Sequence, residues 1–206
     1  MKRIVFLTLS IYMVFTLSLM SAQADSVPAI DFSGVTIDYS SGYWSLGWEF
    51  NVNQAITVTS LGFYDYSRDG LTESHEVGIY DNNKNLLGSG TVSTDDPLLG
   101  FFRYTSITPI VLPIGDDYRI AANTGLEKYT WETVNFTVRP EIQFIQSRYT
   151  NVYSSILVYP VDADAYIGYF GPNFQFESTA VPEPTTMLLL GFGLLGLAGL
   201  RKKLKK

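Results

Sequence analysis

The middle of the chain alternates between apolar and polar residues with a period of two. Between Tyr43 and Val52, positions 44, 46, 48, 50 and 52 are all apolar. Successive side chains of a β-strand point to opposite faces, so this alternation predicts a strand with one buried face.

Shorter runs of the same kind continue to residue 176. They cover residues 55–63, 76–80, 87–93, 100–106, 110–112, 118–122, 133–138, 142–145, 155–159 and 167–176. Residues typical of turns separate several of them, at 81–85, 95–97, 115–117 and 123–125. No helical period is sustained outside the two apolar ends of the chain. We therefore predict an all-β fold, an antiparallel β-sandwich or jelly-roll-like domain over residues 25–180.

The N-terminal residues 1–24 have the three parts of a secretory signal peptide. Two basic residues begin it, residues 4–20 form the apolar stretch, and the small residues Ala22 and Ala24 fit a cleavage site. We predict a signal helix that is removed after Ala24. An uncleaved membrane anchor is the alternative.

The C-terminal residues 181–206 combine a short proline-rich segment, an apolar stretch and a basic end. The apolar residues 185–200 would form a helix of about 24 Å, slightly short of a hydrocarbon core of about 30 Å. Residues 201–206 include five Lys or Arg, which stay on the cytoplasmic side of a membrane. The pattern predicts a transmembrane helix that places the acidic domain outside the inner membrane.

The order of these features resembles the PEP-CTERM sorting signal of Gram-negative bacteria. The matching residues are the triplet Pro182, Glu183 and Pro184 and the basic residues that begin with Arg201, Lys202 and Lys203. The resemblance implies that an exosortase, a membrane-embedded transpeptidase-like enzyme, processes the chain near the triplet. The protein would then reach the cell surface or the exopolysaccharide matrix. An ordinary single-span anchor is the alternative.

Charge and composition narrow the functions open to the central domain. From residue 25 to residue 180, seven Lys plus Arg stand against 19 Asp plus Glu, a balance of −12. Such an acidic domain repels nucleic acid phosphates, which argues against a role with DNA or RNA. The chain has no cysteine and a single histidine, His75. Disulfides, thiolate chemistry and multi-histidine metal sites are therefore excluded within one chain.

The polar stretch 65–76 is the first candidate site. Asp65, Asp69 and Glu73 could offer oxygen ligands to Ca²⁺, and a glycine among them permits a tight turn. A solvated loop whose polar side chains cap turns is the alternative. His75 could serve as a general base, but no Gly-x-Ser-x-Gly elbow accompanies it. We predict that the protein is not an enzyme and needs no cofactor other than this possible Ca²⁺.

Trp131 is the second candidate, as a contact for carbohydrate. It lies in a polar stretch and is predicted to be exposed, where an indole ring could stack on a sugar. Trp44 and Trp48 share the apolar face of their strand and are predicted to lie in the core.

The domain itself is similar to β-sandwich domains of unknown function that are often joined to PEP-CTERM tails. The similar stretches are LGWEF at 46–50, ITVTSLGFYD at 56–65, SHEVGIY at 74–80 and GPNF at 171–174. The resemblance brings no established activity. Three hypotheses follow: a structural or adhesive component of exopolysaccharide, biofilm or floc; a carbohydrate-binding module; and a secreted hydrolase, the least favoured.

Overall fold

The computed structural model describes residues 25–32, 38–133, 135–150, 153, 155–165 and 168–178. The predicted signal peptide, with Ala22 and Ala24, and the predicted sorting signal over residues 181–206 lie outside them. Within the described part of the chain, no helix is long and apolar enough to cross a membrane.

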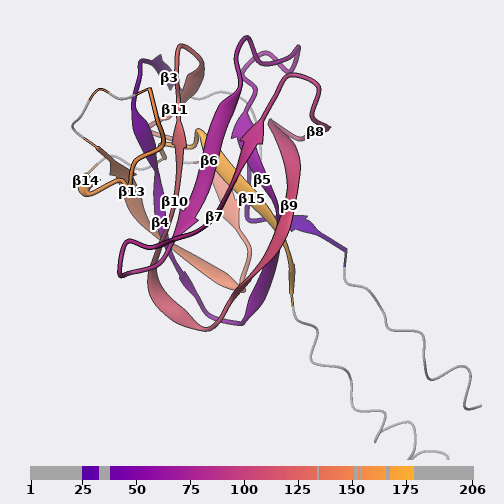
Figure 1. Cartoon of the computed structure of the whole chain (residues 1–206), viewed down its shortest axis with the longest axis vertical. Coiled ribbons are helices and arrows are strands. Elements are labelled where there is room, and N and C mark those ends of the chain that lie inside the picture. The colour runs from indigo at the N-terminus through magenta and orange to yellow at the C-terminus, as the bar shows by residue number, and fades with distance from the viewer. Residues whose placement is uncertain are drawn as a thin grey trace, which may run out of the picture.

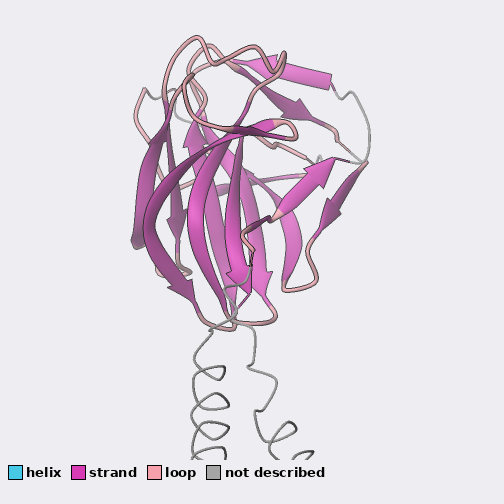
Figure 2. Ribbon diagram, turned by 90° about the vertical axis from the view of Figure 1, so that its right-hand side faces the viewer, coloured by secondary structure: helices cyan, strands magenta, loops and turns pink. Residues whose placement is uncertain are grey.

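All regular secondary structure in the described residues is β-strand, which confirms the predicted all-β fold (Figure 2). The strands are β1 (Val27–Pro28), β2 (Ile30–Phe32), β3 (Asp38–Ser41), β4 (Ser45–Val52), β5 (Ile56–Tyr64), β6 (His75–Tyr80), β7 (Leu86–Val92), β8 (Leu98–Leu99), β9 (Phe102–Leu112), β10 (Gly115–Asn123), β11 (Lys128–Trp131), β12 (Phe136–Val138), β13 (Ile142–Tyr149), β14 (Asp162–Asp164) and β15 (Pro172–Ser178).

Two antiparallel sheets pack face to face as a sandwich (Figure 1). The five-stranded sheet has the order β1-β15-β5-β9-β8, and the six-stranded sheet has the order β14-β13-β4-β10-β6-β7. Two short ribbons, β11-β3 and β12-β2, are paired beside them. Neighbouring strands run antiparallel throughout the described ladders.

The core between the sheets is rich in aromatic rings. Trp48 of β4 stacks on Phe174 of β15 with ring centroids 5.6 Å apart, and both side chains are fully buried. The indole N–H of Trp48 donates to the carbonyl of Pro172 at 3.0 Å, so its polar atom is satisfied inside the core. Because β4 and β15 belong to different sheets, these contacts join the two layers. The predicted core position of Trp48 is confirmed. Trp44 precedes β4 and is only partly buried, against the smaller cluster of Leu46, Tyr129 and Tyr169, so its predicted core position is wrong.

Both ends of the described domain lie at one pole of the sandwich. Ser178, at the end of β15, pairs with Ile56, and Ile56 pairs with Leu112. We call this end the proximal pole. The distal pole, at the other end of the strands, holds the start of β6 at His75 and the end of β10 at Asn123. Among the described residues, the core cluster takes its members from residues 27–176, so we expect residues 25–178 to fold as a unit.

One strand predicted from the sequence is absent. Residues 155–159 are irregular and cover the outer face of the six-stranded sheet. Ser45 of β4 fixes them there, because its hydroxyl donates to the carbonyl of Val158 at 2.5 Å and accepts from the Val158 N–H at 3.0 Å. Leu157, Val158 and Tyr159 are partly buried against the sheet and Ile156 is exposed, so this apolar run packs over existing strands without forming one.

Candidate functional site

Asp65, the first predicted calcium ligand, lies at the end of β5 and is almost fully buried. Its carboxylate accepts from Nε of Arg103 at 2.8 Å and from the N–H of Gly70 at 3.1 Å. Arg103 also donates to the carbonyl of Asp96 at 2.9 Å. The Asp65 carboxylate therefore ties the 65–70 turn to β9, as a buried carboxylate requires a partner.

The other two predicted calcium ligands have different surroundings. Asp69 is exposed, and Glu73 accepts a hydrogen bond from the N–H of Leu126. Among the residues that the structure describes, no three acidic or histidine side chains gather closely enough to hold a metal ion. The structure thus gives Asp65 and Glu73 protein partners instead of bringing the three carboxylates together.

His75 is a core residue at the distal pole. Its ring stacks on Phe63 with centroids 3.8 Å apart, and its Nδ1–H donates to the carbonyl of Asn123 at 2.9 Å. The other ring nitrogen, Nε2, is buried and has no hydrogen-bond partner among the described residues. Burial lowers the pKa of His75, against the opposing influence of the Asn123 carbonyl and of Glu73 and Glu127. This environment holds the ring neutral and away from solvent.

Trp131 lies on β11 and is 38% exposed, in agreement with its predicted surface position. Its ring meets Tyr169 edge to face, with centroids 6.1 Å apart. Tyr169 donates its hydroxyl to Asp164 at 2.6 Å, and burial raises the pKa of Tyr169. Trp131 is therefore partly exposed, and it packs against a tyrosine that is itself held by a hydrogen bond.

A second aromatic group lies beside the β3-β11 ribbon, and no pattern in the sequence predicted it. The ammonium of Lys128 lies 3.7 Å from the ring centroid of Tyr39 and 4.7 Å from that of Tyr66. The two rings are themselves 4.4 Å apart, and hydrogen bonding to Lys128 and Tyr66 lowers the pKa of Tyr39. The cation–π contacts of Lys128 with Tyr39 and Tyr66 therefore join the ribbon to the 65–70 turn.

A buried cluster of charged side chains lies under residues 155–165, and no pattern in the sequence predicted it either. Glu49 of β4 accepts from Nε of Arg119 at 3.1 Å and from Nε of Arg148 at 2.6 Å. Arg119 donates onward to the carbonyl of Pro160 at 2.6 Å and lies 4.7 Å from the ring of Tyr159. Both arginines are thus occupied by protein groups, and the cluster fixes the covering segment to the sheet.

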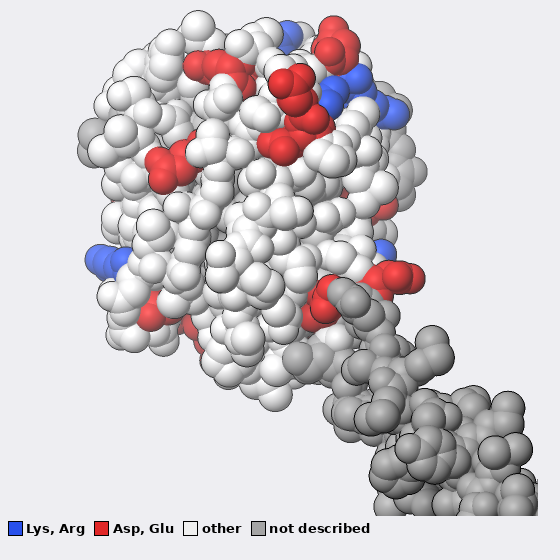
Figure 3. Space-filling view, turned by 45° about the vertical axis from the view of Figure 1, so that its right-hand side comes forward, with Lys and Arg blue, Asp and Glu red and all other residues white. Residues whose placement is uncertain are grey.

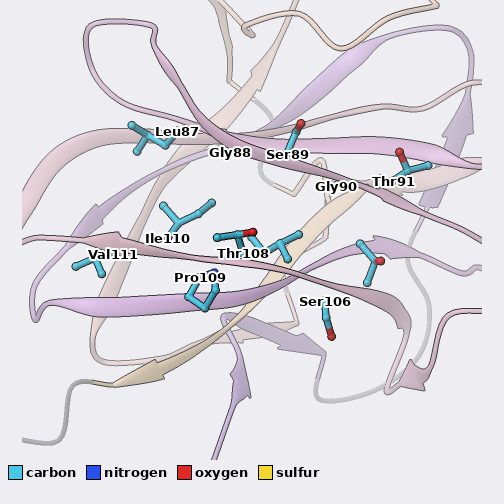
Figure 4. Close-up of a pocket in the computed structure, with 12 residues that line it drawn as sticks. Leu87, Gly88, Ser89, Gly90, Thr91, Ser106, Thr108, Pro109, Ile110 and Val111 are labelled. Carbon is cyan, nitrogen blue, oxygen red and sulfur yellow. The ribbon is translucent and has the colours of Figure 1, made fainter.

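A groove of about 510 Å³ runs between β7 and β9, where the two sheets meet at one side of the sandwich (Figure 4). Its lining is uncharged and consists of Leu87, Gly88, Ser89, Gly90, Thr91, Thr105, Ser106, Ile107, Thr108, Pro109, Ile110 and Val111. Ile110 lies between the two strands in Figure 4, and a Cβ added at Gly88 would stand 2.6 Å from its terminal methyl. The glycines of β7 therefore let β9 approach closely.

Comparison with known families identifies both parts of the chain. Residues 33–170, more than half of the chain, match the family described as Domain of unknown function (DUF4082). Residues 180–203 match the PEP-CTERM protein-sorting motif. A search of the curated proteins finds no match. The two matches confirm the resemblances seen in the sequence.

Proposed function

The chain belongs to the DUF4082 family and carries a PEP-CTERM sorting motif, and from this premise we propose that it is a non-enzymatic surface protein. In this role it contributes structure or adhesion to exopolysaccharide, biofilm or floc.

The sorting motif is the observation that carries the proposal. A PEP-CTERM motif marks a protein for export, for anchoring in the membrane and for processing by an exosortase. β15 ends at Ser178, ahead of Pro182, Glu183 and Pro184, so cleavage near the triplet removes none of the strands that the structure describes. Processing would therefore deliver the sandwich intact.

The arrangement of the domain supports a role at a surface. The chain leaves the sandwich after Ser178 at the proximal pole, so while it is tethered the distal pole is the end far from the point of attachment. Trp131 is exposed on the β3-β11 ribbon, in the upper part of Figure 1, away from the end at which β15 leaves the sandwich. The negative charge of the domain disfavours nucleic acid as a partner and keeps the exported protein soluble.

Mass spectrometry of the mature protein tests the proposed sorting. In cells with the exosortase, we expect a product that lacks Ala24 and everything before it, and that lacks Arg201, Lys202 and Lys203. The product should co-purify with extracellular polysaccharide. A mature chain that still carries Lys203, or a processed chain found only in the periplasm, would contradict the proposal.

A carbohydrate-binding module is the second candidate, favoured by the exposed ring of Trp131. Retention of the purified domain on polysaccharide from the same organism should fall by about fivefold in Trp131→Ala, because an aromatic ring contact contributes on the order of 1 kcal/mol. Tyr153→Ala, which removes another exposed ring, is the matched control. Equal retention of both variants and the unaltered domain would remove Trp131 as the contact.

The non-enzymatic role has its own test. We expect no turnover of glycan or ester substrates by the purified domain. Reproducible turnover that disappears in a variant of one pocket or surface residue would replace the structural role with a catalytic one.

A further inference from the structure

The outermost strands of the two large sheets differ in how well they are protected. An unpaired strand edge exposes N–H and C=O groups that can pair with another chain, and proteins protect such edges by shortness, charge, proline or bulges. β1 and β8 have two residues each, and β1 includes Pro28. β14 has three residues, two of which are Asp162 and Asp164. These three outer strands therefore show the usual protection.

β7 is the exception. It is seven residues long, forms the end of the six-stranded sheet and contains neither a charged residue nor a proline. Its pairing with β6 is regular from Val92 to Gly88, with a register shift only near Leu86. Leu86 and Leu87 are 47% and 39% exposed. From Gly88 to Val92, beyond the irregularity near Leu86, the strand thus presents a regular edge without charge or proline, next to exposed apolar side chains.

β7 itself and the part of β9 beside it are uncharged in a domain whose balance is −12, although Glu76 of β6 lies opposite Thr91 of β7. Neither β7 nor the part of β9 from Tyr104 to Leu112 carries a charged residue. Figure 3 shows the side of the molecule where β7, β8 and β9 lie, and the middle of that face is free of charged side chains. Two copies of this acidic domain repel each other through most surfaces, and this face is where that repulsion is weakest.

We propose that β7 pairs antiparallel with β7 of a second copy, joining the two six-stranded sheets into one continuous sheet across a two-fold axis. A two-fold axis through Ser89 places Gly88 of one copy opposite Gly90 of the other, so only small residues lie at the centre of the joined strands, and Leu87 lies opposite Thr91. A two-fold pairing uses the β7 edge of both copies, so it closes at a dimer. The axis also brings the two β7-β9 grooves next to each other beneath the joined sheets.

Sedimentation velocity on residues 25–178 over a series of concentrations tests the dimer, since this fragment contains every strand that the structure describes. Ser89→Glu should weaken association by about tenfold or more, because two like charges would lie directly opposite each other. Gln143→Glu adds the same charge at an exposed position of β13, away from β7, and should leave association nearly unchanged. Circular dichroism and thermal melting show that both variants keep the fold.

Hydrogen exchange locates the contact independently. We expect amides of residues 86–92 to gain protection as the concentration of the unaltered fragment rises, and we expect Ser89→Glu to lose that gain. A fragment that stays monomeric at every concentration overturns the proposal and leaves the edge to a glycan or to a strand from another protein. A dimer that resists Ser89→Glu, or that responds equally to Gln143→Glu, overturns it as well. The result does not depend on whether the protein binds polysaccharide.

Discussion

At the residue scale, the buried polar side chains of this domain make the most specific contacts of its interior. Asp65, Glu49 and His75 are all nearly inaccessible, and each has a specific protein contact. A buried carboxylate needs a cation or several donors, and both carboxylates here have arginine partners. Because these residues contact only protein groups, we expect substitutions at these positions to lower the stability of the fold.

The histidine makes stability depend on pH. Burial lowers the pKa of His75 in the folded state, so below about pH 6.5 the unfolded chain binds a proton that the folded domain does not. Stability is therefore complete above that pH and falls as the pH is lowered, by at most about 1.4 kcal/mol per unit. We expect urea titrations of the domain to show this loss between about pH 7.5 and about pH 5.5.

His75→Gln is the comparison for that measurement. It removes the only histidine of the chain, so the loss of stability over this pH interval should largely disappear. The readout is the change between the two pH values, which cancels any overall difference in stability. An unchanged pH dependence in the variant would show that another group is responsible.

Calcium should have little effect on the domain. The carboxylate of Asp65 is occupied by Arg103 and by the N–H of Gly70, which leaves it poorly placed to bind an ion. We expect the melting temperature to be the same with millimolar Ca²⁺ and with a chelator, because only selective binding to the folded state raises it. A calcium-dependent rise that Asp69→Asn abolishes would instead support the site predicted at Asp65, Asp69 and Glu73.

At the element scale, the segment 155–165 is held to the outer face of β4, β10 and β13 by the Glu49 cluster. Replacing Glu49 by Gln leaves Arg119 and Arg148 without a carboxylate partner while both stay largely buried. We expect a loss of about 3 kcal/mol or more in unfolding free energy. Amides in residues 155–165 should exchange faster with solvent than in the unaltered protein.

Glu76→Gln is the matched control for this prediction. Glu76 is exposed on β6, and its replacement should change stability by about 0.5 kcal/mol or less. Similar losses in both variants would mean that the cluster contributes nothing particular to the covering segment.

The element scale also shows where sequence patterns succeed and fail. The alternation in β4 correctly predicted that Trp48, Phe50 and Val52 face the core. It placed Glu49 on the opposite face, and nothing local indicated that residues 155–165 would bury that face. The same limitation produced the false strand at 155–159, since a short apolar run looks the same in a strand and in an irregular segment packed over a sheet.

At the scale of the whole molecule, the fold and the sorting signal are separable. Every described strand lies between Val27 and Ser178, and the sorting motif matches residues 180–203. Removing residues 181–206 should therefore leave the melting temperature of the exported domain unchanged. The same deletion should abolish exosortase processing and the association with extracellular material.

Calorimetry of the domain with and without that tail checks the first half of the prediction, and cell fractionation checks the second. A lower melting temperature after the deletion would mean that the tail contributes to the fold. Normal delivery of the shortened protein would mean that sorting uses another part of the chain.

The sequence alone determined the class of fold, because short runs with a period of two indicate strands locally. It also determined that the protein is sorted for export, because the sorting signal is a linear motif that a membrane enzyme recognises. Only the tertiary structure decided the rest. Contacts between residues far apart in the chain decide which arginine pairs with each buried carboxylate. They also bury His75 against Phe63 and leave one strand unprotected at the end of a sheet. Those contacts follow from the order in which strands pair, and no local pattern encodes that order.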